Sequence, residues 1–147
     1  MEAPVILIGI GEMGSVFARG FLRNGHPVYP VTRQTDLAEA AQQLPSPELV
    51  LVAVAENDLH AVLEQIPAAW SGRSAVLQNE LLPGDWQQHG LTHPTVISVW
   101  FEKKKGQDVK VLIPSPVYGP QAEALQQCLG SLDIPARIVA DENELLF

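Results

Sequence analysis

The stretch that decides the fold is Val-Ile-Leu-Ile-Gly-Ile-Gly-Glu-Met-Gly-Ser at residues 5–15. An apolar, β-prone run leads directly into Gly9, Gly11 and Gly14. This Gly-x-Gly-x-x-Gly spacing between a strand and a helix is typical of a turn that binds the diphosphate of a dinucleotide. The first glycine permits a tight turn, the second lets a phosphate approach the backbone, and the third lets the helix pack close to the strand.

The stretch therefore predicts a strand at 4–10, a helix at 12–24 and an anion site between them. The start of a helix carries free N–H groups and a partial positive charge, and both suit a diphosphate. The alternative is a glycine turn that serves packing alone.

Outside this stretch, apolar strand-like runs alternate with helical patterns along the whole chain. Further strands are expected at 27–32, 49–54, 74–78, 95–101, 109–113 and 136–139. Further helices are expected at 36–44, at 58–67 and after Gly119-Pro120. This alternation predicts an α/β fold, a Rossmann-like, doubly wound and mostly parallel sheet. The runs at 95–101 and 109–113 predict a late antiparallel hairpin at an edge of that sheet.

Length and composition favour a single domain without a membrane or nucleic-acid partner. The chain has 147 residues and a formal net charge of −8, which suits a nucleic-acid partner poorly. It has no apolar run long enough to span a membrane and no basic segment before an N-terminal apolar run, so a cytoplasmic protein is expected. We expect a dinucleotide-binding domain at 1–140. Residues 141–147 read as the start of a helix that leads to an absent second domain, or as a terminus docked on the sheet, and their apolar end suits a homodimer.

Two further features have simple structural interpretations. Cys128 lies in an apolar helical pattern and is expected to be a buried small hydrophobe. The cluster Lys103-Lys104-Lys105 precedes a Gly-Gln-Asp segment and is expected to be the solvated tip of the hairpin.

The end of the second predicted strand indicates which cofactor is bound. NAD-binding domains place an acid there to accept from the ribose 2′-hydroxyl. This chain instead has Thr32 and Arg33, and a guanidinium matches the geometry of a 2′-phosphate. Asp36 is better placed to cap the following helix. NADP is therefore favoured over NAD; the alternative is an exposed arginine without a ligand.

Other site residues are expected where the remaining strands end, because ligands of open α/β sheets bind beyond the carboxyl ends of the strands. These residues are Ala53, Val54 and Ala55 at the end of the third strand and Asn79 after the fourth, the last as a hydrogen-bonding partner of the nicotinamide ribose or a substrate. No nucleophile–base pair and no metal site can be read from the sequence, so the catalytic residues stay unknown.

Several of these segments also resemble a known family. The run Ile8-Gly9-Ile10-Gly11-Glu12-Met13-Gly14, followed by Gly25-His26-Pro27-Val28 and Thr32-Arg33, resembles the 6-phosphogluconate-dehydrogenase-like NAD(P)-binding superfamily. Leu77-Gln78-Asn79 and Val117-Tyr118-Gly119-Pro120 are similar to segments of ketopantoate reductases.

This resemblance implies a Rossmann domain that serves the NADPH-dependent reduction of a small 2-oxo acid. It places the cofactor across Gly9 to Met13, with Arg33 on the 2′-phosphate and Asn79 on ribose or substrate. The catalytic lysine of that family belongs to a helical second domain that has no counterpart in this chain. The resemblance therefore leaves open a reductase that needs a second domain and a catalytically inactive module that binds or senses a dinucleotide.

Overall fold

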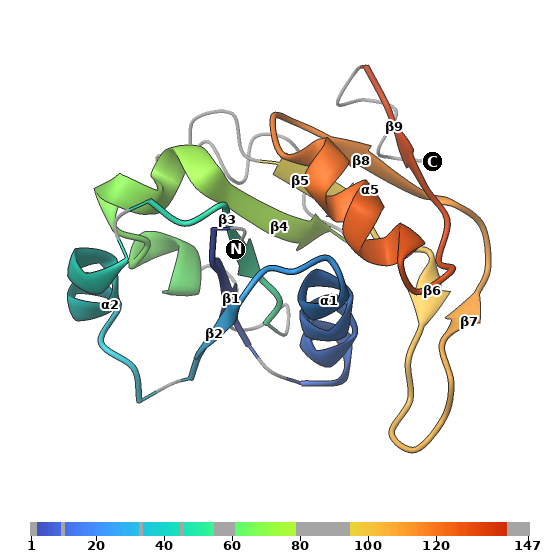
Figure 1. Cartoon of the computed structure of the whole chain (residues 1–147), viewed down its shortest axis with the longest axis horizontal. Helices are drawn as coiled ribbons and strands as arrows, with labels where there is room; N and C mark the ends of the chain where they lie inside the picture. The colour runs from blue at the N-terminus through green and yellow to red at the C-terminus, as the bar shows by residue number, and fades with distance from the viewer. Residues whose placement is uncertain are drawn as a thin grey trace.

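The computed structural model describes residues 3–9, 11–32, 34–44, 46–54, 61–78 and 95–140. Within these ranges, a seven-stranded sheet lies between helices (Figure 1). Its strands are β1 (Val5–Ile8), β2 (Val28–Val31), β3 (Leu49–Val52), β4 (Ser74–Gln78), β5 (Thr95–Ser98), β8 (Ser115–Tyr118) and β9 (Ala136–Ile138). The helices are α1 (Glu12–Arg23), α2 (Leu37–Gln43), α5 (Ala122–Gly130) and the 3-10 helix η1 (Ala68–Arg73).

The sheet has the order β2-β1-β3-β4-β5-β8-β9. The first five of these strands pair in parallel, whereas β8 is antiparallel to β5 and parallel to β9. The predicted α/β, doubly wound and mostly parallel sheet is therefore confirmed. The chain winds one way from β1 to β2 and the other way from β3 to β5, so the order reverses between β1 and β3.

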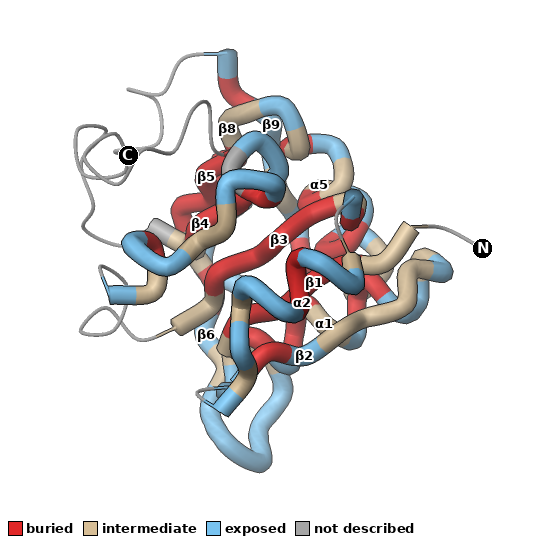
Figure 2. The backbone as a smooth tube through the Cα atoms, turned by 90° about the vertical axis from the view of Figure 1, so that its left-hand side faces the viewer, coloured by how far each residue is buried: buried red, intermediate tan, exposed pale blue. Residues whose placement is uncertain are grey.

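Both faces of the sheet are covered. Along β1, Val5 and Leu7 join a buried cluster with residues of α1 and α5, whereas Ile6 and Ile8 join a cluster with residues of α2 and η1. The residues of β3 alternate in the same way, as expected for a run without polar residues. All four residues of β1, of β3 and of β5 are accordingly buried (Figure 2). Each fully buried Val, Leu or Ile side chain contributes about 1.5–3 kcal/mol to stability.

Helices α1 and α5 approach each other closely at Gly20 and Cys128. A Cβ atom at Gly20 would lie 2.5 Å from both the carbonyl oxygen and the Sγ of Cys128. The thiol donates to the carbonyl oxygen of Phe17 at 3.3 Å, and burial raises the pKa of Cys128 to about 12. Cys128 is thus a neutral packing residue, which confirms its predicted role.

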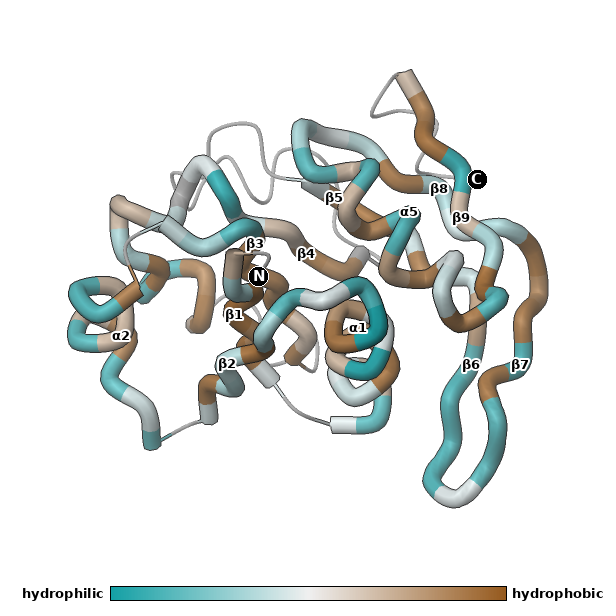
Figure 3. The backbone as a smooth tube through the Cα atoms, in the orientation of Figure 1, coloured by the Kyte–Doolittle hydropathy of each residue, from teal (hydrophilic) through white to brown (hydrophobic). Residues whose placement is uncertain are grey.

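The C-terminal half departs from the predicted strand pattern. A hairpin is confirmed, but its strands β6 (Phe101–Glu102) and β7 (Lys110–Val111) form a separate two-stranded sheet, so its expected place at an edge of the main sheet is wrong. The chain leaves the main sheet after β5, where Trp100 N donates to Ser115 Oγ at 2.9 Å and Trp100 O accepts from Leu112 N at 2.9 Å. In Figure 3 the tip of this hairpin is hydrophilic.

The antiparallel strand of the main sheet is β8, which the sequence did not predict. Its Pro116 lies in register with Arg137 of β9, and a proline in an apolar run argues against a sheet interior because it cannot donate a backbone hydrogen bond. Residues 61–64 are helical, within the expected helix at 58–67, and residues 141–147 lie outside the described ranges. Among the described residues, no helix has the length and apolarity needed to cross a membrane.

Candidate functional site

The candidate site lies where the strand order reverses. Ligands of doubly wound sheets bind at such a switch point, beyond the carboxyl ends of the strands. Here Gly9 follows β1 and donates from its backbone N–H to the carbonyl oxygen of Val31 at 3.2 Å. Ala53 follows β3 and donates to the carbonyl oxygen of Ile8 at 2.8 Å. Backbone hydrogen bonds therefore connect the ends of β2, β1 and β3 at the glycine turn.

Two of the three glycines are required by close packing. Gly9 has a φ of +97°, and a Cβ atom there would lie 2.5 Å from the carbonyl oxygen of Ala53 and 3.0 Å from Cγ1 of Val54. A Cβ atom on Gly14 would overlap the carbonyl oxygen of Gly9. The first turn of α1 therefore sits directly on the turn that leaves β1.

Gly11 has a different role, because nothing around it requires a glycine. It is exposed, and among the described residues no atom lies within 4 Å of the position that a Cβ atom would take. Gly11 is also the N-cap residue of α1 and supplies no side-chain hydrogen bond to the first helical N–H groups. The first four N–H groups of a helix have no partner within the helix. The turn thus combines open space with backbone donors, which are the two features that a diphosphate needs.

The end of β2 is closed by a short turn between Thr32 and Thr35. Thr35 N donates to the carbonyl oxygen of Thr32 at 3.1 Å, and Thr32 N donates to Thr35 Oγ1 at 3.1 Å. Directly after this turn, Asp36 Oδ1 accepts from Glu39 N at 3.2 Å and caps α2. The predicted cap is confirmed, and Asp36, the acid nearest in sequence to the end of β2, therefore serves α2.

A cation from the hairpin lies at the start of α1. Lys103 Nζ is 3.2 Å from Glu12 Oε2, and it donates to the carbonyl oxygen of Lys104 at 2.8 Å. The Lys103 side chain is 14% exposed, whereas that of Glu12 is 45% exposed. Lys104 and Lys105 are exposed, as expected of a hairpin tip, but the expectation of a solvated side chain is wrong for Lys103.

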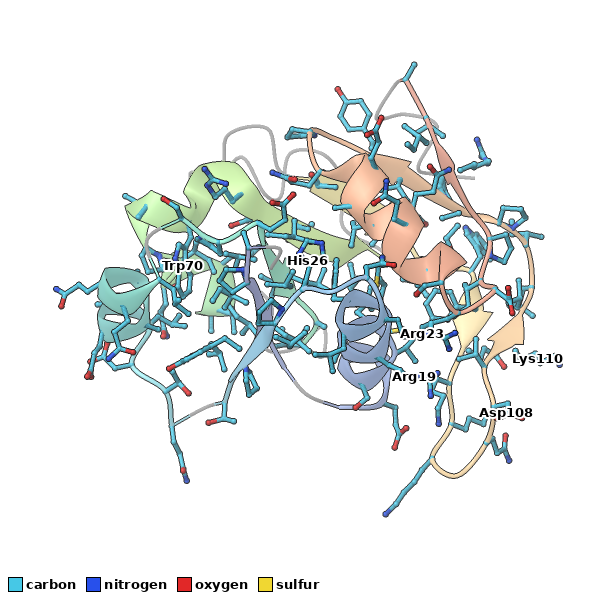
Figure 4. The ribbon with its side chains drawn as sticks, in the orientation of Figure 1. Arg19, Arg23, His26, Trp70, Asp108 and Lys110 are labelled. Carbon is cyan, nitrogen blue, oxygen red and sulfur yellow. The ribbon has the colours of Figure 1, made fainter. Side chains whose placement is uncertain are left out.

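Packing at the base of the hairpin explains this position. Phe101 of β6 is buried and contacts Phe17 of α1, with ring centroids 6.2 Å apart. This contact brings the hairpin alongside α1, and Figure 1 shows the two elements next to each other. Figure 4 shows the side chains of this region, with Arg19 and Arg23 on α1 and Asp108 and Lys110 on the hairpin.

The structure therefore brings together most of the predicted site residues that it describes. Gly9, residues 11–14, Ala53 and Val54 lie around the switch point, and Thr32 directly follows the neighbouring strand β2. The predicted site residues Ile10, Arg33, Ala55 and Asn79 lie outside the described ranges. Lys103 was not predicted, because nothing in the sequence distinguishes it from the two lysines that follow.

Comparison with known proteins supports the fold. No protein-family model and no curated protein sequence matches this chain. Among solved structures, it is similar to a protein assigned as an NADP oxidoreductase from Bacteroides fragilis, with a TM-score of 0.66, 19% identity, and coverage of 98% of this chain and 62% of that one. It is also similar to a ketopantoate reductase from Ralstonia eutropha JMP134, with a TM-score of 0.63 and 15% identity. That similarity covers 94% of this chain and 57% of the reductase. A dimeric ketopantoate reductase from Staphylococcus aureus has a TM-score of 0.64 and 14% identity. Its similarity covers 96% of this chain and 61% of that protein.

These similarities establish the class of fold. The chain has the Rossmann-like α/β fold that it shares with ketopantoate reductases and a related oxidoreductase, so the resemblance expected from the sequence is confirmed at the level of the fold. The chain spans about three fifths of the length of each of these proteins.

Proposed function

We propose that this chain is the NADP-binding domain of an oxidoreductase similar to ketopantoate reductase, which reduces a small 2-oxo acid when a second domain is present. The observation that carries the proposal is the open position at Gly11, at the start of α1 and at the point where the strand order reverses. Solved oxidoreductases with the same fold support it.

Each predicted residue has a defined task in this proposal. The backbone N–H groups at the start of α1 bind the diphosphate, and the glycines keep side chains out of its way. Thr32 and Arg33 bind the 2′-phosphate. Ala53, Val54 and Ala55 form a wall of the crevice, and Asn79 binds ribose or substrate. When bound, NADPH supplies the hydride.

The preference for NADP rests on the end of β2. A carboxylate there would accept from the ribose 2′-hydroxyl of NAD and repel the 2′-phosphate of NADP. Asp36, the acid nearest to that end in sequence, instead accepts a hydrogen bond from the backbone of α2. Arg33 offers a planar fork of donors that matches a phosphate.

The replacement Gly11→Ala tests the diphosphate site. We expect the variant to fold with an unchanged melting temperature, because its new methyl group meets no atom of the described part of the chain within 4 Å. Its affinity for both NADPH and NADH is expected to fall by about tenfold or more, because the methyl group occupies the space through which the phosphate approaches. Isothermal titration calorimetry measures both affinities.

The matched control is Gly130→Ala at the end of α5, where a new Cβ atom also meets no atom within 4 Å in the described ranges. This control is expected to keep the wild-type affinities. A Gly11→Ala variant that binds as tightly as the control contradicts the proposed site, and a wild-type protein that binds neither dinucleotide contradicts the proposed function.

The replacement Arg33→Ala tests the cofactor preference. Loss of a charged hydrogen bond of about 1.5–3 kcal/mol is expected to weaken NADPH binding by roughly tenfold or more. NADH lacks the 2′-phosphate, so its affinity should stay nearly unchanged. The control is Arg137→Ala on β9, an exposed arginine in the strand at the opposite end of the sheet from β2. Equal losses for NADPH and NADH would show that Arg33 does not bind the 2′-phosphate.

A homodimer is part of the same proposal, because one of the similar ketopantoate reductases is dimeric. Val111, Leu112 and Ile113 are exposed apolar residues on the hairpin and could contribute to such a contact. The mass of the protein in solution tests this point: a monomer at micromolar concentration rejects it.

A further inference from the structure

Glu12 creates an electrostatic problem at the proposed diphosphate site. It is the first residue of α1 and directly follows Gly11, at the helix end that is expected to attract an anion. Two negative charges about 4 Å apart repel each other by about 1 kcal/mol even in bulk water, and by more where water is displaced. An unpaired carboxylate here would therefore weaken the binding of any diphosphate.

Lys103 resolves this problem in the structure. Its ammonium group lies 3.2 Å from the Glu12 carboxylate and cancels its charge. The Lys103 side chain is largely shielded from water, at 14% exposure, although its neighbours Lys104 and Lys105 are exposed. Phe101, two residues before Lys103 in the hairpin, packs on Phe17 of α1 and so holds Lys103 near the start of that helix.

The ammonium group also has a donor to spare. A lysine has three N–H donors. One points to Glu12 Oε2 and one to the carbonyl oxygen of Lys104. Within the described part of the chain, no acceptor is found for the third. The two occupied donors orient the ammonium group beside the first turn of α1 and leave the third for a ligand.

We propose that Lys103 is a diphosphate-binding residue, carried to the start of α1 by the hairpin and oriented there by Glu12. This inference rests on the proposed function and adds to it the side chain that recognises the bridging phosphates. In the complex, Lys103 donates to a phosphate oxygen and stays paired with Glu12, so the carboxylate orients the cation and no longer repels the ligand.

The chemistry recognised by Lys103 differs from that recognised by Arg33. A diphosphate is common to NADPH, NADH and ADP, whereas only NADPH of these three carries a 2′-phosphate. A cation on the diphosphate must therefore affect all three ligands by a similar factor. This distinction separates the two residues in one set of measurements.

The decisive variant is Lys103→Gln, which removes the charge and leaves Glu12 uncompensated. Its affinities for NADPH, NADH and ADP, measured by isothermal titration calorimetry at low ionic strength, are expected to fall together by roughly tenfold. The matched control is Lys104→Gln, which removes an exposed lysine from the next position and should bind like the wild type. A thermal melt of each variant shows that the fold is retained.

Two further variants test the role of Glu12. In the Lys103→Gln background, the additional change Glu12→Gln should recover part of the lost affinity, because it removes the uncompensated carboxylate. The conservative change Lys103→Arg keeps the charge and should bind more tightly than Lys103→Gln. Both results would be absent if Lys103 only stabilised the hairpin.

The possible failures are distinguishable. If the wild type binds the dinucleotides and Lys103→Gln binds like Lys104→Gln, this inference is overturned and the proposed function stands. A loss confined to NADPH also overturns it, because it assigns Lys103 to the 2′-phosphate. A wild-type protein that binds none of the three ligands overturns both proposals.

Discussion

Replacing Gly9 with alanine is expected to lower the free energy of unfolding by about 2–6 kcal/mol, and with it the population of folded protein. Two independent costs add at this position. The φ of +97° is strained for any residue with a side chain, at about 1–3 kcal/mol. The new methyl group would also lie 2.5 Å from the carbonyl oxygen of Ala53, and forcing extra volume into a packed site costs about 1–3 kcal/mol.

Urea unfolding followed by circular dichroism measures this loss. The matched control is Gly106→Ala at the tip of the hairpin, where φ is +74° but no atom of a described residue lies within 4 Å of the new methyl group. The control carries the backbone strain alone, about 1–2 kcal/mol. The difference between the variants is the cost of separating β1 from β3. Equal stabilities would mean that the ends of these strands are not packed as described.

The second large effect is expected for Trp70→Ala, at about 3–5 kcal/mol of lost stability. Trp70 lies in η1, is completely buried, and belongs to the core cluster that also holds Ile6, Val50 and Val76. Its indole Nε1 donates to the carbonyl oxygen of Leu44 at 2.9 Å. The side chain therefore fills the core on one face of the sheet and also ties η1 to the end of α2.

The control Trp70→Phe retains an aromatic ring and loses the hydrogen bond to Leu44. We expect it to cost less than Trp70→Ala, since most of the buried apolar surface is kept, although a buried acceptor without a partner costs about 1–3 kcal/mol. Chemical denaturation of both variants gives the comparison. A Trp70→Ala variant within 1 kcal/mol of the wild type would contradict the buried position of this side chain.

The N-terminal half of the fold could be predicted from sequence because its signals are local. The apolar run at residues 5–8 and the glycine spacing determine β1 and α1, and the predicted helices at 12–24 and 36–44 end within about one residue of α1 and α2. The cap at Asp36 follows from an acid placed three residues before the N–H group that it accepts from. The fourth strand was predicted with its observed bounds, Ser74–Gln78.

The features that were not predicted depend on contacts between residues far apart in the chain. β8 contains Pro116, which cannot donate to the sheet, and its pairing with β5 and β9 is what identifies it as a strand. The ion pair of Glu12 and Lys103 joins residues 91 positions apart, so no local sequence pattern predicts it. Trp70 is a core residue through its contact with Leu44, on another segment.

During translation, α1 is synthesised long before α5, the helix that packs on it. The three strand ends that meet at Gly9 all lie within the first 54 residues, whereas α5, which packs on α1 at Gly20, ends at residue 130. At about 5–20 residues per second, a ribosome needs several seconds to synthesise the chain between these points. Throughout that interval Phe17 and Phe21, which are fully covered in the finished protein, lack the cover that α5 provides. The nascent chain is therefore prone to aggregate through the uncovered face of α1, the helix at the candidate site.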